Sequence, residues 1–321
     1  MAEHDLIGVD IGGTTVKMAF ITYTGDIIDK WEIPTDKSDG ASNVVADIAS
    51  SIQSKQQENG YNANDFVAIG VGAPGFMDIQ RGFVYEAVNV GWKDYPLGER
   101  LREATGYPVF LENDANLAAL GEFWKGSGSQ TTNMLAVTLG TGVGGGIIAN
   151  GQLLHGTNGT VAEIGHMTVE MNNPMPCNCG KMGCLETVAS ATAIAKLAKQ
   201  AVEEGKTTSL ALLMKENGFV TAKDVFDAAD QDDKVANEIL EYVINTLGVS
   251  IANLAIALNP AKIVIGGGVS KAGNRLLTPL RKVFDQHALT RTSDVVEFVI
   301  ASLGNDAGVL GAAYLAKNAV K

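Results

Sequence analysis

Cysteine is scarce in this chain of 321 residues, and all of it lies in one place. The three cysteines fall between Cys177 and Cys184, so a network of disulfides spread over the chain is excluded. So few cysteines are typical of a protein from a reducing compartment, where clustered thiols bind metals more often than they pair. We therefore expect a metal site in this segment and no disulfides.

Positive charge is also in short supply. The chain has 24 Lys and Arg against 36 Asp and Glu, which gives a formal net charge of −12. A surface of this sign repels the phosphate backbone of nucleic acids and anionic lipids. We therefore expect neither a nucleic-acid partner nor a membrane partner.

Long apolar runs, low-complexity segments and short repeats are absent from the sequence. A transmembrane helix needs roughly 18 or more apolar residues in succession, so none is expected. The segment Met1–Asp5 is polar and acidic, unlike the start of a secretion signal. Hydrophobic residues make up 46% of the chain and charged residues 19%, which is typical of a globular protein with a sizeable core. We expect a cytoplasmic protein.

Strand and helix patterns alternate along both halves of the chain, which predicts an α/β fold. Each half begins with a strand, a glycine-rich turn and a second strand, which suggests a weak internal duplication. A largely helical stretch at about 186–258 interrupts the second half, and a helix at 306–319 closes the chain. The predicted strands are 6–10, 16–21, 27–33, 66–72, 108–112, 134–139, 147–149, 262–265 and 295–301.

Three glycine clusters follow predicted strands. Glycine lets backbone N–H groups approach an anion closely, and a threonine hydroxyl adds a donor. An aspartate at a strand end can hold Mg²⁺, usually through water. Ordinary hairpin turns explain any single cluster equally well, but three together favour a nucleotide site. The clusters are Asp10-Ile11-Gly12-Gly13-Thr14, the turn Gly140-Thr141-Gly142 continuing to Gly146, and Gly266-Gly267-Gly268-Val269.

Two stretches match the dinucleotide pattern G-x-G-x-x-G, at 70–75 and 140–145. That pattern requires a helix straight after the turn, and here both matches are followed by strand and turn residues instead. A phosphate-binding P-loop ending in Gly205-Lys206-Thr207 is excluded because its upstream glycine is replaced by Gln200. Neither a dehydrogenase nor a P-loop enzyme is therefore expected.

Asn113 and Asp114 lie just beyond the strand predicted at 108–112. Ligands of α/β folds bind at the carboxyl ends of strands, and a kinase needs a carboxylate that accepts the proton of the attacking hydroxyl. Asp114 could also cap the helix that starts at Ala115, and the two roles are compatible. Asn113 would suit a neighbouring hydroxyl.

The cysteine cluster predicts a structural zinc site. Zinc commonly takes three thiolates and one histidine, and His166 is the nearest of the four histidines to Cys177. Glu163 and Glu186 flank the two ends of the cluster, where their carboxylates could accept hydrogen bonds from sugar hydroxyls. Each glutamate taken alone would more often be an ordinary surface charge. The ligands predicted for zinc are His166, Cys177, Cys179 and Cys184.

Taken together, these motifs resemble the ROK family of sugar kinases and repressors, and most of all the bacterial ROK glucokinases. The resemblance runs over nearly the whole length. It rests on 10–14, Gly72-Ala73-Pro74-Gly75, Asn89-Val90-Gly91-Trp92, 112–116, 139–146, Glu163-Ile164-Gly165-His166 and the C-x-C-G-x-x-G-C-x-E run from Cys177 to Glu186.

The resemblance implies a two-lobed, actin-like (ribonuclease-H-like) fold with a cleft between the lobes. We expect a small lobe at 1–115 with about 305–321 and a large lobe at 116–304, which carries the zinc loop and the helical stretch. The implied reaction is transfer of phosphate from ATP to the 6-hydroxyl of glucose, with Asp114 as the base. The sugar contacts implied are Gly75, Asn113, Asp114, Glu163, His166 and Glu186, and the ATP contacts are Asp10, Gly12, Gly13, Thr14, Gly140, Thr141, Gly142, Gly267 and Gly268.

Some features stay open at this point. Ala162 stands where the family usually has glycine before the glutamate of the Glu-x-Gly-His motif. Relatives also act on fructose, mannose, N-acetylglucosamine or N-acetylmannosamine, and others are DNA-binding repressors. A repressor is disfavoured because the first predicted strand begins at Leu6 and the net charge is negative. Relatives are dimers or tetramers, so we expect a homodimer or homotetramer.

Overall fold

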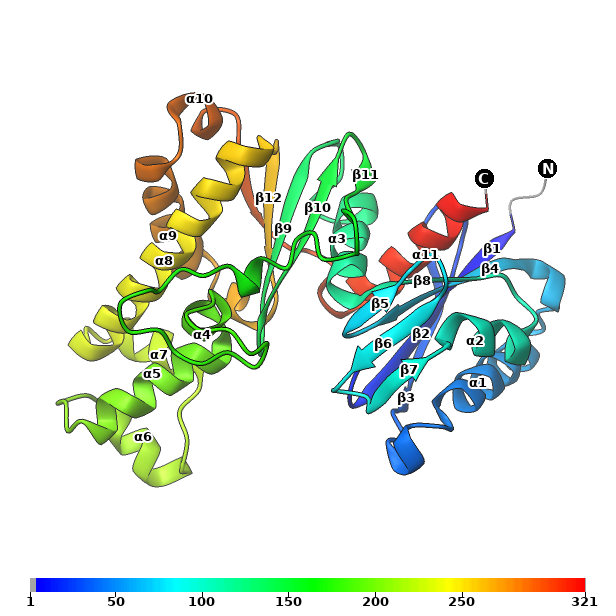
Figure 1. Cartoon of the computed structure of the whole chain (residues 1–321), viewed down its shortest axis with the longest axis horizontal. Coiled ribbons are helices and arrows are strands. Elements are labelled where there is room, and N and C mark those ends of the chain that lie inside the picture. The colour runs from blue at the N-terminus through cyan, green and yellow to red at the C-terminus, as the bar shows by residue number, and fades with distance from the viewer. Residues whose placement is uncertain (1–3, 321) are drawn as a thin grey trace. The chain divides into compact units, whose positions relative to one another are not determined.

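A computed structural model describes residues 4–320 of the chain (Figure 1). The first part of the segment Met1–Asp5 therefore lies outside the described residues. The described chain divides into two compact units. Unit 1 comprises the residues up to Gln130, the segment Leu153–Val161 and the residues from Ser302 onward, and unit 2 comprises Thr131–Gln152 and Ala162–Ala301.

Unit 1 is built on a five-stranded sheet of order β3-β2-β1-β4-β8, with a separate three-stranded sheet of order β5-β6-β7. Its strands are β1 (Asp5–Ile11), β2 (Thr15–Ile21), β3 (Ile27–Pro34), β4 (Phe66–Ala73), β5 (Phe76–Asp78), β6 (Phe83–Ala87), β7 (Trp92–Tyr95) and β8 (Val109–Asn113). Its helices are α1 (Val44–Asn59), α2 (Leu97–Thr105), α3 (Asp114–Lys125) and α11 (Ala307–Ala319), with short 3₁₀ turns at Ser38–Gly40, Ala63–Asp65 and Gly304–Asp306.

Unit 2 repeats the same strand order in the sheet β11-β10-β9-β12-β13. Its strands are β9 (Met134–Leu139), β10 (Val143–Ala149), β11 (Gln152–Leu153), β12 (Lys262–Gly266) and β13 (Glu297–Ile300). Its helices are α4 (Glu186–Ala189), α5 (Ala191–Glu203), α6 (Leu210–Asn217), α7 (Ala222–Ala229), α8 (Lys234–Leu258), α9 (Asn274–His287) and α10 (Thr290–Ser293), with 3₁₀ turns at Ile164–His166 and Gly268–Ala272. The matching strand orders confirm the internal duplication that the sequence suggests.

The sheet of unit 1 is covered on both faces. Side chains alternate between faces along a strand, so neighbours in β1 enter different cores. Ile7 and Val9 lie in the cluster that contains Ile48 of α1 and Leu101 of α2. Leu6 lies in a second cluster with residues of α11, among them Val309, Leu310 and Ala313. The central strands are apolar on both sides for this reason.

Paired glycines let α11 lie directly on the sheet. Gly8 of β1 and Gly70 of β4 are partners in the parallel ladder. A Cβ atom at Gly8 would lie 2.2 Å from the carbonyl oxygen of Val309, and one at Gly70 would lie 1.8 Å from that of Ala312. No side chain fits in either space, so the helix backbone packs against the strand backbone.

The structure divides the chain at other places than the sequence predicts. The sequence places the first boundary after residue 115, whereas α3 lies within unit 1. The reason is close packing of α3 against α11: a Cβ at Gly121 would lie 2.1 Å from the carbonyl oxygen of Ala307, and one at Gly311 would lie 1.8 Å from that of Leu117. The segment Leu153–Val161 also returns to unit 1, which the sequence gives no reason to expect.

The start of strand β10 is predicted wrongly from the sequence, because its glycines are interpreted as a turn. A turn is predicted through Gly146, but the strand begins at Val143, so Gly144, Gly145 and Gly146 are strand residues. A Cβ at Gly145 would lie 2.6 Å from the carbonyl oxygen of Ala162, so this glycine serves close approach and not a turn. The small sheet β5-β6-β7 is also missed, because its strands have only 3 to 5 residues and lie between glycine turns.

Helix α8 is, by length and composition, apolar enough to cross a membrane. Half of its most apolar window is buried inside the protein, where it packs against α5, α7 and α9. It is the central helix of unit 2 (Figure 1).

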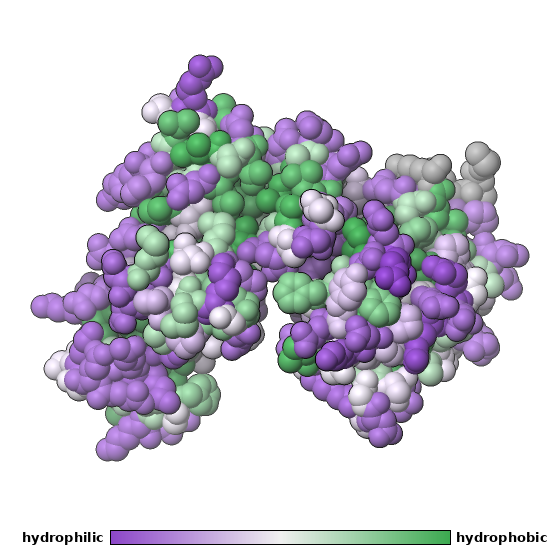
Figure 2. Space-filling view, viewed as in Figure 1, coloured by the Kyte–Doolittle hydropathy of each residue, from purple (hydrophilic) through white to green (hydrophobic). Residues whose placement is uncertain are grey.

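The surface of unit 2 is not uniform in polarity. Figure 2 shows polar side chains over α5 and α6 and more apolar ones near β12 and the adjacent end of α8. Exposed apolar residues of unit 2 include Ile256, Leu289 and Val295.

Replacement of Gly70 by alanine tests the packing of α11. The added methyl group must push the helix backbone away from β4, and overpacking of this kind typically destabilises a protein by roughly 1–3 kcal/mol. We expect Gly70→Ala to lower the melting temperature measured by calorimetry. Gly140→Ala is the matched control, since no atom of the described residues lies within 4 Å of a Cβ at that position. Equal melting of the two variants would contradict the packing account.

Candidate active site

Three parallel strands of unit 1 end at one edge of its sheet. Strands β1, β4 and β8 are parallel to one another, and their carboxyl ends carry Asp10, Gly75 and Asn113. Asp10 and Glu112 are both ladder neighbours of Gly72. Ligands of α/β proteins bind at such edges. The structure therefore brings together the unit 1 residues that the sequence predicts for the site.

The β1–β2 hairpin presents Gly12, Gly13 and Thr14 at this edge. Gly12 donates its N–H to the carbonyl of Thr15 at 2.9 Å, and Thr35 donates its hydroxyl to the carbonyl of Gly12 at 2.7 Å. A Cβ at Gly13 would lie 2.8 Å from the carbonyl oxygen of Asn89. The hairpin is thus held from both sides, as an anion site built from backbone groups requires.

The Asp10 carboxylate lies beside the start of α11. A Cβ at Gly308 would lie 2.4 Å from its Oδ2 atom. Burial raises the pKa of Asp10, and the nearby Lys17 opposes this shift. A carboxylate that has lost much of its water is a suitable partner for a hydrated divalent cation.

Asn113, and not Asp114, caps helix α3. The side chain of Asn113 accepts hydrogen bonds from the N–H groups of Ala115 at 2.9 Å and Asn116 at 3.4 Å. Its Nδ2 atom donates to the carbonyl of Gly75 at 3.4 Å. Asp114 is the first residue of the helix and is exposed, with its Oδ1 atom accepting from the N–H of Ala115 at 2.9 Å. The carboxylate that the sequence singles out as a base is therefore accessible to a substrate.

Glu112 is a functional candidate that the sequence interpretation misses. It is only 1% exposed, and its Oε2 atom lies 2.6 Å from Nε2 of His155. Its Oε1 atom accepts from the N–H of Asn113 and from the Nδ2 of Asn116, both at 2.9 Å. His155 lies 43 positions away in the sequence, so no local motif reveals the pair.

In unit 2, two predicted glycine clusters lie side by side. Gly140 begins the turn after β9, and Gly267 follows β12 in the same sheet. A Cβ at Gly267 would lie 2.5 Å from the carbonyl oxygen of Leu139, and its φ of 82° also favours glycine. Among residues 4–320, no atom lies within 4 Å of a Cβ at Gly140 or Gly268, so open space adjoins both.

Glu186 connects this glycine turn with the cysteine cluster. Its Oε2 atom accepts from the N–H of Val143 at 3.1 Å, and a Cβ at Gly142 would lie 2.1 Å from the same oxygen. Its Oε1 atom lies 3.9 Å from the sulfur of Cys177. Thr141 is exposed beside it. The carboxylate thus lies between the predicted phosphate turn and the predicted metal ligands.

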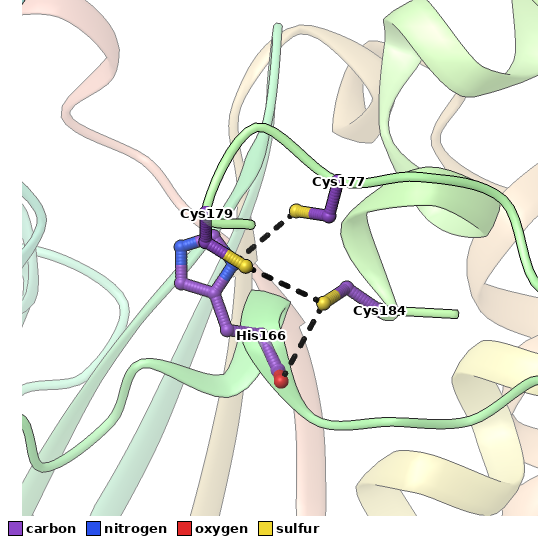
Figure 3. A group of neighbouring side chains, drawn as sticks. All are labelled: His166, Cys177, Cys179 and Cys184. Atoms are coloured by element: carbon purple, nitrogen blue, oxygen red, sulfur yellow. Dashed lines mark hydrogen bonds between the residues drawn. The ribbon is translucent and has the colours of Figure 1, made fainter. Parts of the chain in front are cut away.

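The four predicted metal ligands converge (Figure 3). Their ligand atoms all lie within 4.8 Å of one another. The Sγ atoms of Cys179 and Cys184 are 3.7 Å apart, as are Sγ of Cys177 and Nδ1 of His166. Tetrahedral zinc with bonds of about 2.3 Å to sulfur sets neighbouring sulfurs about 3.8 Å apart. The cluster is compatible with a structural zinc ion.

Glu163 and His166 extend the polar surface next to the cluster. Oε2 of Glu163 lies 3.9 Å from Nε2 of His166. Burial raises the pKa of Glu163, His166 lowers it, and the charge of Glu186 raises it again. The three side chains are therefore close enough to influence one another, as a shared sugar site in unit 2 would require.

Ala162 adopts a left-handed backbone conformation, with φ at 68°. An alanine in this conformation is strained because its Cβ crowds the following carbonyl oxygen. Its own carbonyl accepts from the N–H of Ile164 at 2.6 Å, which closes a tight turn with Glu163 at its centre. A glycine would adopt the same conformation without strain, which explains physically why the motif commonly has glycine here.

The comparison with known proteins agrees with these observations. The sequence model of the ROK family matches residues 6–319 of the chain. The chain belongs to the ROK family. A glucokinase of Halalkalibacterium halodurans is 55% identical to this ROK chain over 317 residues, which are 99% of the chain and 96% of that protein.

Solved ROK structures share the fold of the whole chain. The ROK hexokinase from Thermus thermophilus is 30% identical with a TM-score of 0.84, covering 98% of this chain and 99% of that one. The ROK family glucokinase from Streptomyces griseus, in complex with glucose and AMPPNP, is 34% identical with a TM-score of 0.77, covering 98% and 99%. The predicted two-lobed, actin-like α/β fold is thereby confirmed.

The strain at Ala162 predicts that Ala162→Gly stabilises this ROK chain. Removing the strain of the left-handed conformation stabilises the folded state by roughly 1–2 kcal/mol. The greater conformational freedom of glycine in the unfolded chain offsets about 0.5–1 kcal/mol of this gain. We expect a net gain of about 0.5–1 kcal/mol in the free energy of unfolding, measured with urea. Ala46→Gly, at an exposed position in α1, is the control and should lose stability. A loss at both positions would contradict the account.

The Glu112–His155 pair predicts a pH-dependent contribution to stability. The hydrogen bond with Glu112 raises the pKa of His155, and partial burial opposes the shift. Protonated His155 is thus favoured in the folded state, so its contribution is complete below pH about 6.5 and disappears as the pH rises through the folded-state pKa. We expect the difference in unfolding free energy between the unmodified chain and His155→Gln to shrink from pH 6 to pH 9. A difference that grows with pH would contradict this.

Proposed function

We propose that this ROK chain is an ATP-dependent glucokinase, which transfers the γ-phosphoryl group of ATP to the 6-hydroxyl of glucose. The observation that carries the proposal is the exposed carboxylate of Asp114 at the carboxyl edge of the unit 1 sheet, beside Asn113 and Gly75. The close similarity to a glucokinase over 99% of the chain supports it.

In the proposed reaction Asp114 accepts the proton of the 6-hydroxyl as the oxygen attacks the γ-phosphorus in line. A carboxylate within hydrogen-bond reach of the hydroxyl can act as the proton acceptor. Phosphoryl transfer needs little covalent help from the protein and depends mainly on positioning and charge stabilisation. A carboxylate fixed at the first position of a rigid helix meets that requirement.

The two glycine hairpins are proposed to bind ATP. Gly13 and Thr14 of unit 1, and Thr141 and Gly142 of unit 2, would offer backbone N–H groups and hydroxyls to the phosphates. The N–H groups of Gly12 and Gly140 close the two turns. Gly268 adjoins open space for the adenosine, and Gly267 is the glycine that lets the chain pass close to Leu139 just before it. Asp10 would hold Mg²⁺ through water, and this ion would supply positive charge to the phosphate oxygens.

The sugar is proposed to contact both sets of polar residues. Asn113 and the Gly75 backbone belong to unit 1, and Glu163, His166 and Glu186 belong to unit 2. Carboxylates and amides accept and donate the directed hydrogen bonds that hydroxyl groups require.

Zinc is proposed to be structural. His166, Cys177, Cys179 and Cys184 would complete a closed tetrahedral site with no position left for a substrate. Burial raises the pKa of the Cys184 thiol, so the thiolate form needs a neighbouring cation. Bound zinc would fix His166 and the start of α4, and so the carboxylate of Glu186.

The substrate could be another hexose, because a ROK hexokinase structure is also similar to this chain. Recognition of one hydroxyl or acetamido group decides between such sugars. We propose glucose as the preferred substrate. Phosphorylation rates with fructose, mannose, N-acetylglucosamine and N-acetylmannosamine measure that preference.

A cytoplasmic location and a homodimer or homotetramer are proposed as well. The exposed side chains of Ile256, Leu289 and Val295 supply apolar surface for contacts between subunits.

Replacement of Asp114 by asparagine tests the base directly. The amide keeps the shape of the side chain but cannot accept the proton, and loss of general base catalysis typically lowers the rate by about 10²–10⁴-fold. We expect kcat in a coupled ADP-release assay to fall by that factor while glucose affinity by calorimetry changes little. Asp47→Asn, the same substitution in the first turn of α1, is the control and should leave kcat unchanged. Undiminished turnover in Asp114→Asn would remove Asp114 as the base.

Removal of zinc tests the structural site. We expect about one zinc per chain by elemental analysis, because four ligands fill one tetrahedral site. Chelation should lower both the melting temperature and the affinity for glucose, since the metal fixes His166 and Glu186. Added zinc should restore both, whereas added magnesium should not. A chain that is purified without zinc and binds glucose normally would refute the site.

A further inference from the structure

One buried carboxylate, that of Glu112, is hydrogen-bonded to the turn between β8 and α3. Glu112 is the last residue but one of β8 and is 1% exposed, so water contributes almost nothing to its solvation. Three donors replace that water: the N–H of Asn113, the Nδ2 of Asn116 and the Nε2 of His155. Buried carboxylates are tolerated in proteins only with partners of this kind.

Two of these donors belong to the turn that carries the proposed catalytic residues. The N–H of Asn113 and the side chain of Asn116, itself 5% exposed, lie on either side of Asp114 in the sequence. Glu112 therefore fixes the backbone direction at which α3 starts. The direction of the Asp114 side chain follows from that start.

The third donor comes from a distant part of the sequence. His155 lies in the segment Leu153–Val161, which belongs to unit 1 although β10 before it and Ala162 after it belong to unit 2. The His155 side chain is 33% exposed, and its 2.6 Å contact with Glu112 is the shortest of the three. The contact anchors this segment, which leads directly into Glu163 and His166.

We propose that Glu112 and His155 form a positioning pair for phosphoryl transfer, which holds the Asn113–Asp114 turn and the segment Leu153–Val161 of unit 1 in one fixed arrangement. The inference rests on the proposed function. A buried ion pair is a poor source of stability, since well-packed apolar residues in its place are often as stable or more so. A directed carboxylate, however, orients neighbouring groups as no apolar residue can.

A positioning role is distinguished from a structural one by kinetics. His155→Leu removes the donor at similar volume, and His155→Gln keeps an N–H donor without the charge. Displacement of a reacting group by about 1 Å can lower the rate about 10²-fold, so we expect kcat of His155→Leu to fall by roughly 10–100-fold. The KM for ATP should change less than about twofold, because the glycine hairpins are untouched, and His155→Gln should recover most of kcat.

Combining Glu112→Gln with His155→Leu supplies a second test. If the two side chains act as one unit, the double variant Glu112→Gln with His155→Leu should lose no more kcat than the stronger single variant. His287→Leu is the matched control, since His287 contacts only a backbone carbonyl of α9 among the described hydrogen bonds, and it should keep full kcat. Zinc content and the melting temperature verify that each variant is folded.

The outcomes separate this inference from the proposed function. An unmodified chain that does not phosphorylate glucose, or an active Asp114→Asn variant, would remove the proposed function. If the unmodified chain is active and Asp114→Asn is inactive, normal kcat in folded His155→Leu overturns the positioning pair alone. Equal losses in His155→Leu and His155→Gln, or losses that multiply in the double variant, would overturn it too.

Discussion

The hydrogen bonds around the β8–α3 turn are the constraint on which the proposed site depends. Glu112 binds the turn from inside the protein, and Asn113 caps the helix from its end. Between them they leave Asp114 exposed at the first helical position. An exposed carboxylate on a loop would be mobile, whereas Asp114 is fixed at the start of α3, directly after the edge strand β8. In phosphoryl transfer, the main requirement on the base is correct placement next to the attacking hydroxyl.

Glycine sets the distances in the rest of the fold. Gly8 and Gly70 let α11 lie on the sheet of unit 1, and Gly121 lets α3 lie against α11. The same property serves the proposed ATP site, where Gly142 gives room to the carboxylate of Glu186. The abundance of glycine in the chain thus has two physical origins, helix-on-strand contact and exposed backbone donors. Sequence alone does not separate them, as the strand glycines of β10 demonstrate.

Much of the fold and part of the candidate site could be predicted from the sequence. The cysteine cluster is local, so its spacing predicts the convergence with His166 that the structure has. The longer strands of both five-stranded sheets follow from their apolar runs and turns, whereas the two-residue strand β11 is missed. The short strands β5, β6 and β7 do not, because 3 to 5 residues give no clear alternation. The Glu112–His155 pair could not be predicted either, since a contact between residues 43 positions apart depends on how the chain returns to unit 1. The left-handed conformation of Ala162 becomes visible only in the backbone angles.

The central claim is that the Asp114 carboxylate takes the proton from the sugar alcohol that attacks ATP. A crystal structure of the chain with glucose and a non-hydrolysable ATP analogue tests it most directly. The account predicts a carboxylate oxygen of Asp114 within hydrogen-bond distance of the 6-hydroxyl, about 2.6–3.2 Å, with that hydroxyl facing the terminal phosphate. A 6-hydroxyl bound instead to another carboxylate, with Asp114 directed away from the sugar, would contradict it.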